Sequence, residues 1–260
     1  MNQDQVKAKL LDIQDAPLEF SVIFSGKQSR KVNGLYKPET REIILHNKNF
    51  NDDNQLLYTA IHEYAHHLHA CRRGGSLSSR AHSCEFWAIF HGLLETAEQK
   101  KIYRDVFRDS AELSELTELI KKKYLLENGS LVKELGMQLL RAHELCTAAG
   151  ARFEDYVDRI LRIPRIAADM AIKMHQYDLD PQVGADNMRF LAGIRNDDQR
   201  LAAEQALIKG KSPDTVRSGI RGEEEDPQLR LAKEKQRLER TIASLTRRLE
   251  EVNRELEQGS

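Results

Sequence analysis

Residues 59–68 read TAIHEYAHHL and contain the pattern H-E-x-x-H. Residues four apart on an α-helix lie on the same face, so a helix here would direct the imidazoles of His62 and His66 toward one point. Two neutral imidazoles arranged in this way form half of a zinc site, and Glu63 beside them can serve as a general base. The stretch therefore predicts a helix that carries metal ligands and a proton-transfer group.

The flanking residues also favour a helix. Apolar side chains recur at spacings of four, three and four, at Leu57, Ile61, Tyr64 and Leu68. Upstream, Asp52 and Gln55 have the spacing of a capping box, which predicts that the helix begins there. A five-residue pattern with two free positions also arises by chance on histidine-rich surface helices, so the interpretation depends on finding a third ligand.

The third ligand must come from another element. A catalytic zinc site needs three protein ligands and an open fourth position. His69 would lie roughly 10 Å along the helix axis from His62, too far for one small ion. His82 follows after a glycine- and serine-rich segment, and Phe86, Ile89, Phe90 and Leu93 outline a second amphipathic helix. An antiparallel return of this helix would bring His82 back to the first one.

Two other side chains near His82 are alternatives for this role. Glu85 lies one helical turn further on and could replace His82 as the third ligand. If His82 binds the metal, Glu85 is expected to orient a ligand imidazole instead. Cys84 is a weaker candidate that more commonly packs as a small apolar residue. For His46, His67, His69 and His91, ordinary hydrogen bonding is the expected role.

The two motifs together, H-E-x-x-H at 62–66 and H-x-x-E-F at 82–86, resemble those of the SprT-like zinc metallopeptidases, a family that includes the DNA-dependent protease Spartan. The resemblance covers roughly residues 18–125. The family's second motif reads H-G-x-E-[FW], so Ser83 departs from it. The chain has three cysteines and therefore lacks the cysteine-rich zinc ribbon of several relatives.

The resemblance implies a zinc metallopeptidase that hydrolyses peptide bonds of protein substrates, including proteins associated with DNA. It implies one catalytic Zn²⁺ held by His62, His66 and His82, with Glu63 as the general base. It also implies that an extended substrate docks along a sheet edge, near Tyr36 or between Ile43 and His46. The alternative function is a DNA-binding or regulatory protein in which the zinc fold is mainly a scaffold.

The N-terminal part predicts an α+β fold. Residues 2–14 favour a short helix, residues 18–25 alternate as a strand, and residues 34–36 and 41–45 flank a turn typical of a hairpin. A short sheet followed by the H-E-x-x-H helix would form a small zincin-type metallopeptidase core, the SprT-like domain of residues 1–125.

Residues 130–218 predict an all-helical domain. Gly129 is expected to end one helix, Ser130 to begin the next, and residues 181–195 to form a single helix. The segment 163–174 loosely resembles a helix-turn-helix. Acidic and basic residues balance in this region, so DNA binding would need a local patch. The candidates are Arg159, Arg162 and Arg165, which would share one helical face if the helix were continuous.

The C-terminal part predicts an acidic linker at residues 219–228 and a coiled coil at residues 229–258. A heptad pattern is set by Leu231, Leu238, Ile242, Leu245, Leu249, Val252 and Leu256. Such a seam favours parallel self-association, and hence a homodimer. Folding back on the helical domain is the alternative.

Composition limits the partners and the compartment. The 260 residues carry a formal net charge of −1, so no bulk charge favours nucleic acid or membranes. No run of apolar residues is long enough to span a bilayer. Three cysteines without a framework spacing favour a reducing compartment. We therefore expect a cytoplasmic protein with no membrane partner.

Overall fold

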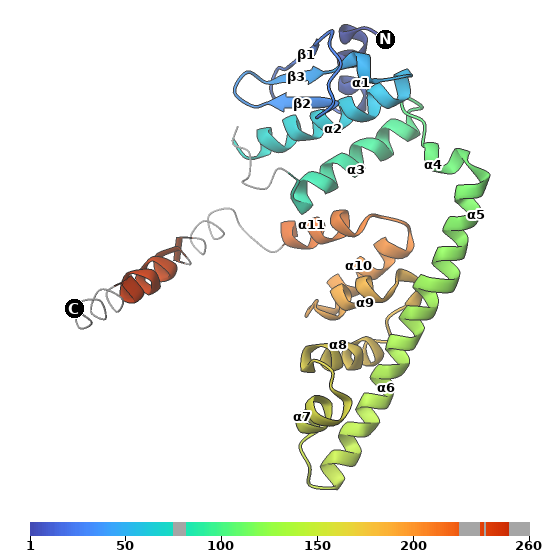
Figure 1. Cartoon of the computed structure of the whole chain (residues 1–260), viewed down its shortest axis with the longest axis vertical. Coiled ribbons are helices and arrows are strands. Elements are labelled where there is room, and N and C mark those ends of the chain that lie inside the picture. Colours follow the sequence, from blue (N-terminus) through green and yellow to red (C-terminus); the bar gives the residue numbers. More distant parts are fainter. Residues whose placement is uncertain (75–81, 224–234, 237, 250–260) are drawn as a thin grey trace. The chain divides into compact units, whose positions relative to one another are not determined.

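The computed structural model describes residues 1–74, 82–223, 235–236 and 238–249. The chain divides into two compact units, Met1–Ser218 and Gly219–Ser260, which are described separately. The first unit is mostly helical and contains one three-stranded sheet (Figure 1). This agrees with the broad α+β class expected from the sequence.

The sheet is built from β1 (Ser21–Phe24), β2 (Gly34–Lys37) and β3 (Glu42–Leu45) in the order β1-β3-β2. β2 and β3 are antiparallel, which confirms the hairpin, and β1 runs parallel to β3. Because β3 is paired on both sides, the segment from Ile43 to Leu45 is not available to a substrate strand. The described strands leave the outer edge of β2 free.

Two helices follow the sheet, α2 (Asp53–Arg72) and α3 (Cys84–Gln99). α2 lies between the sheet and α3 (Figure 1). The two helices are antiparallel, because Asn54 at the start of α2 bonds the backbone of Arg104, beyond the end of α3. The predicted return of the chain is therefore observed.

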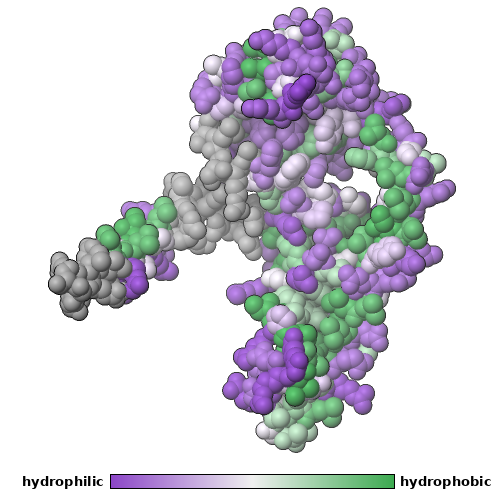
Figure 2. All heavy atoms as spheres, viewed as in Figure 1, coloured by the Kyte–Doolittle hydropathy of each residue, from purple (hydrophilic) through white to green (hydrophobic). Residues whose placement is uncertain are grey.

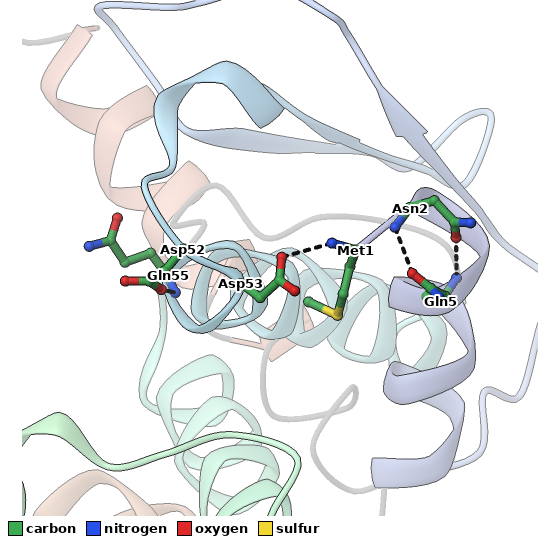
Figure 3. Close-up of polar contacts among 6 residues, drawn as sticks. All are labelled: Met1, Asn2, Gln5, Asp52, Asp53 and Gln55. Carbon is green, nitrogen blue, oxygen red and sulfur yellow. Dashed lines mark hydrogen bonds and ion pairs between the residues drawn. The ribbon is translucent and has the colours of Figure 1, made fainter.

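Side-chain caps fix where the first helices begin (Figure 3). Asp52 accepts a hydrogen bond from the backbone N–H of Gln55 at 2.8 Å, as expected for the start of α2. The reciprocal capping box forms instead at α1 (Gln3–Ile13), between Asn2 and Gln5. The Met1 amino group also donates to Asp53 at 2.8 Å, and so links the starts of α1 and α2.

One hydrophobic core joins α1, the sheet, α2 and α3. Its largest fully buried side chains are Leu10, Ile43, Leu45, Ile61, Tyr64, Leu68, Phe86, Phe90 and Leu93. Burying an aliphatic or aromatic side chain of this size stabilises the fold by about 1.5–3 kcal/mol. Three of these residues, Ile61, Tyr64 and Leu68, belong to α2, so the motif helix is anchored in the core.

A long helical run follows α3. After α4 (Val106–Asp109) it comprises α5 (Ala111–Leu119), the π-helical segment η2 (Ile120–Leu126) and α6 (Glu127–Ala148). The expected break at residues 129–130 was wrong. Gly129 is buried inside the helix, and a Cβ at this position would lie only 2.7 Å from the carbonyl oxygen of Pro181. The glycine permits close packing, and Ser130 bonds the carbonyl of Leu126 within the helix.

The remaining elements are η1 (Asn47–Asn49), which precedes α2, and then α7 (Phe153–Asp155), η3 (Tyr156–Leu161), α8 (Arg165–Gln176), η4 (Pro181–Val183), α9 (Ala185–Ala192), α10 (Asp197–Ile208) and α11 (Pro213–Glu223). Of these, α7, α8, η4 and α9 contact α6 (Figure 1). The single helix expected at residues 181–195 was wrong. Gly184, with φ of 82°, separates η4 from α9.

The three arginines proposed for DNA do not share a helix. Arg159 lies in η3, Arg162 ends that element in the left-handed conformation with φ of 55°, and Arg165 begins α8. Arg165 is also paired with Asp158. The segment 163–174 contains one helix, α8, and not the two of a helix-turn-helix.

Apolar side chains gather on exposed helical surfaces (Figure 2). In the first unit they follow the long helical run, at Leu113, Leu116, Leu119, Ile120, Tyr124 and Leu125. None of the described helices combines the length and the apolar character needed to cross a bilayer. Cys71, Cys84 and Cys146 are not disulfide-bonded.

In the second unit, residues 235–236 and 238–249 are helical. Residues 229–234, 237 and 250–258 of the predicted coiled coil lie outside the described residues. The predicted seam positions Leu238, Ile242, Leu245 and Leu249 are 50–65% exposed. Residues 224–228 of the predicted linker also lie outside the described part.

We expect Gly136→Ala to lower the free energy of unfolding. The new Cβ would overlap the carbonyl oxygen of Ala171 on α8, and overpacking of this kind costs about 1–3 kcal/mol. Gly92→Ala on α3 is the matched control. No atom lies within 4 Å of the added Cβ there, so a gain of about 0.5–1 kcal/mol is expected. Urea unfolding measures both, and equal effects would contradict the close packing of α6 on α8.

We expect Ile242→Asp to abolish self-association, because a carboxylate would have to be desolvated in the seam. Ser244→Asp, at an exposed position off the seam, is the control and should leave the assembly unchanged. Light scattering after gel filtration gives the mass. A wild-type monomer at all concentrations would contradict the homodimer.

Candidate metal centre

Three histidines from two segments converge in the described structure. The Nε2 atom of His82 lies 3.1 Å from Nε2 of His62 and 3.2 Å from Nε2 of His66. Ligand nitrogens about 2.0–2.1 Å from a tetrahedral zinc are separated by about 3.3 Å. These three side chains are the group able to hold a metal ion among the described residues, and their spacing is compatible with zinc.

The start of α3 places His82 opposite α2. His82 immediately precedes Ser83, the N-cap of α3, whose side chain accepts a hydrogen bond from the N–H of Phe86 at 3.2 Å. Ser83 has φ of −78°, a conformation open to any L-residue, so glycine is not required here. Serine at the position where the SprT-like motif has glycine instead supplies a helix cap.

Burial keeps the two α2 histidines of this group neutral. It lowers the pKa of His62 to about 4, and the nearby His82 lowers it further. Burial likewise lowers the pKa of His66 to about 3, with contributions from His62 and His82. Metal ligands must be deprotonated imidazoles, so at neutral pH these lone pairs are ready for a cation.

Glu63 faces the same cavity as the three histidines. It is 6% exposed, and burial raises its pKa to about 7, against the opposing effect of a hydrogen bond from the backbone of Tyr36. A general base works best when its pKa is close to the operating pH. The buried position of Glu63 thus provides a carboxylate that can gain and lose a proton near neutrality.

The cavity has a volume of 460 Å³ and separates the histidines from β2. Its other walls are formed by Val32, Asn33, Gly34, Leu35, Tyr36, Tyr58 and Thr59. Gly34 allows β2 to lie close to α2, because a Cβ there would be 3.0 Å from Cγ of Glu63 and from Cγ2 of Thr59.

The free edge of β2 directs backbone groups toward this cavity. The N–H of His46 donates to the carbonyl of Asn33 at 2.9 Å, so Asn33 faces β3. Backbone groups alternate along an antiparallel strand, and those of Gly34 and Tyr36 therefore point away from β3. The hydrogen bond between the Tyr36 backbone and Glu63 agrees with this direction.

The hydroxyl groups of two tyrosines close to the motif are already engaged in hydrogen bonds within the protein. The Tyr36 hydroxyl donates to Nδ1 of His67 at 3.0 Å, while Nε2 of His67 donates to the carbonyl of Leu18. Burial raises the pKa of Tyr36 to about 12. The Tyr64 hydroxyl donates to the carbonyl of Gln14 at 2.6 Å. Tyr58, 40% exposed, lines the cavity one turn before His62.

Glu85 lies outside the histidine cluster. Its Oε2 is 3.3 Å from Nε2 of the fully buried His69 and 3.8 Å from Nη1 of Arg73. The imidazole that Glu85 contacts is therefore His69 and not one of the three convergent ones. Cys84 also points elsewhere, to the carbonyl of Asp214 at 3.1 Å.

His46 and His91 make ordinary hydrogen bonds, as expected. His46 Nδ1 lies 2.9 Å from Oγ of Ser25, and His91 Nδ1 lies 2.8 Å from Oγ of Ser212. Sequence reasoning missed the contribution of residues 32–35 to the cavity. Gly34, the first residue of the predicted extended segment 34–36, was the available signal for close approach of the backbone.

Comparisons with known proteins found no matching protein-family model, no matching curated protein and no matching solved structure. The resemblance to SprT-like peptidases therefore depends on the motif residues alone. The convergence of the histidines is an independent property of the structure, because it follows from how α2 and α3 pack.

We expect Glu63→Gln to stabilise the metal-free protein in a pH-dependent way. The pKa of Glu63 rises from 4.5 to about 7 on folding, so the native state binds more protons than the unfolded state between these values. Wild-type stability therefore falls as pH rises through this window, whereas Glu63→Gln lacks this loss. The advantage of the variant should grow from near zero at about pH 4 to at most about 3 kcal/mol at about pH 8.

Chemical denaturation at several pH values, with chelator present, measures this difference. Glu112→Gln on the exposed side of α5 is the control and should follow the wild-type curve. A constant difference between Glu63→Gln and wild type across the whole range would contradict the raised pKa.

Proposed function

We propose that this chain is a zinc-dependent metallopeptidase that hydrolyses peptide bonds of protein substrates. The observation that carries the proposal is the placement of three imidazole nitrogens at zinc spacing in the same cavity as the buried Glu63. Three protein ligands and an open side are typical of catalytic zinc sites, whereas structural sites have four. The absence of a fourth ligand among the described residues fits the catalytic type.

The chemistry would be divided between the metal and Glu63. Zinc bound by the histidines would polarise a peptide carbonyl and lower the pKa of a water molecule toward neutrality. Glu63 would take the proton on its carboxylate, since its pKa of about 7 allows protonation near neutral pH. Glu63 would then deliver this proton to the leaving amine.

The free edge of β2 would hold the substrate. An extended peptide can add to a sheet edge through main-chain hydrogen bonds, with little dependence on its side chains. Gly34 offers backbone groups on that edge, and the walls nearby include the apolar side chains Val32 and Leu35. These features support an unfolded or extended segment of a protein as the substrate.

We expect substitutions of the three histidines and of Glu63 to have different effects on zinc content and on cleavage. His62→Ala, His66→Ala and His82→Ala should each lose bound zinc, because two remaining imidazoles leave the ion incompletely coordinated. Glu63→Gln should keep one zinc per chain and lose cleavage of casein about 100-fold or more, the usual effect of removing a general base. His46→Ala, whose imidazole bonds Ser25 elsewhere, is the control and should change neither property.

Metal analysis and a cleavage assay on free and DNA-bound protein substrates provide the readouts. Zinc retained at full stoichiometry in His82→Ala would contradict the site. A zinc-loaded wild type that cleaves none of these substrates would contradict the peptidase. A steep salt dependence in gel-shift titration would then favour the DNA-binding alternative.

A further inference from the structure

We propose that Phe86 is a positioning residue that holds the three imidazoles in their convergent arrangement. The inference rests on the proposed metal site, and it assigns to the ring of Phe86 a part of the metal affinity of that site. This role differs from general core packing, because it depends on contacts between the aromatic ring of Phe86 and the three imidazoles.

Phe86 contacts every member of the histidine cluster. Its ring centroid lies 5.0 Å from that of His62, 4.3 Å from His66 and 4.7 Å from His82. It stacks on His66 with an interplanar angle of 28° and meets the other two edge to face, at 67° and 63°. Among the described aromatic contacts, Trp87 reaches two of the three, namely His62 and His82.

The position of this ring is itself fixed. Phe86 is fully buried, and its backbone N–H is bonded to the cap residue Ser83. The neighbouring Glu85 connects α3 to α2 through His69, one turn beyond the ligands on each side. His82 lies before the first residue of α3, so it lacks the support of a regular helix and depends on such contacts.

Preorganisation explains why this matters for the metal. A side chain that is already confined to its binding rotamer loses less conformational entropy when the ion binds. The flat ring restricts three imidazoles at once, and its aromatic face gives the stacking geometry that an aliphatic side chain lacks. Hydrogen-bonding groups that orient metal ligands commonly contribute about 10–100-fold to metal affinity, and we expect a contribution near the lower end of this range from Phe86.

The test compares Phe86→Leu with Leu93→Ala in the full chain. Leu93 is equally buried on α3 and belongs to the same core, so its truncation also lowers stability. We expect Phe86→Leu to weaken zinc binding by about 10-fold or more and to alter the visible absorption spectrum of the Co²⁺-loaded protein. Leu93→Ala should keep the wild-type affinity and spectrum.

Zinc affinity is measured by competition with a chromogenic chelator, after urea unfolding has shown that each variant is folded. Phe86→Met, which fills a similar volume, replaces Phe86→Leu if the latter is not folded, and the same loss is expected. Wild-type affinity and spectrum in the folded Phe86 variant would overturn the inference and leave the proposed function intact. A wild type that binds no zinc would overturn both.

Discussion

The convergence of three imidazole lone pairs is the constraint on which the rest of the site depends. Two of them are supplied by one turn of α2, and the third belongs to a residue that precedes α3. Because neutral imidazole nitrogens do not attract one another at about 3 Å without a shared proton or cation, the fold must hold them there. Burial keeps His62 and His66 uncharged, and the packing of α3 on α2 sets the position of His82.

The same helix also links the metal ligands to the sheet. Glu63 follows His62 in sequence but faces β2, where Gly34 leaves room for its side chain. The backbone of Tyr36 bonds Glu63, while the hydroxyl of Tyr36 is anchored to His67. The strand edge, the carboxylate and the histidines thus line one 460 Å³ cavity. A substrate strand and a metal ion would meet there without a large rearrangement.

Much of this arrangement is encoded locally and could be predicted. The helix of H-E-x-x-H follows from apolar spacing and the Asp52 cap, and the hairpin from alternation around a turn. The choice of His82 over Glu85 as the third ligand needed the family resemblance. The two residues are one helical turn apart, and their spacing from His66 does not decide which of them reaches the other two histidines. Features set by contacts between distant segments were missed. Gly129 reads as a helix end, yet it is buried against Pro181, and the role of Phe86 depends on two helices whose packing no single motif specifies.

The most direct test of the convergent site is zinc X-ray absorption spectroscopy on the purified full chain. The proposed function predicts one zinc with three imidazole nitrogens at about 2.0–2.1 Å and one further light atom. The spectrum of His82→Ala should show one imidazole fewer if any zinc remains. A sulfur ligand at about 2.3 Å, or a wild-type spectrum with two imidazoles, would contradict the account.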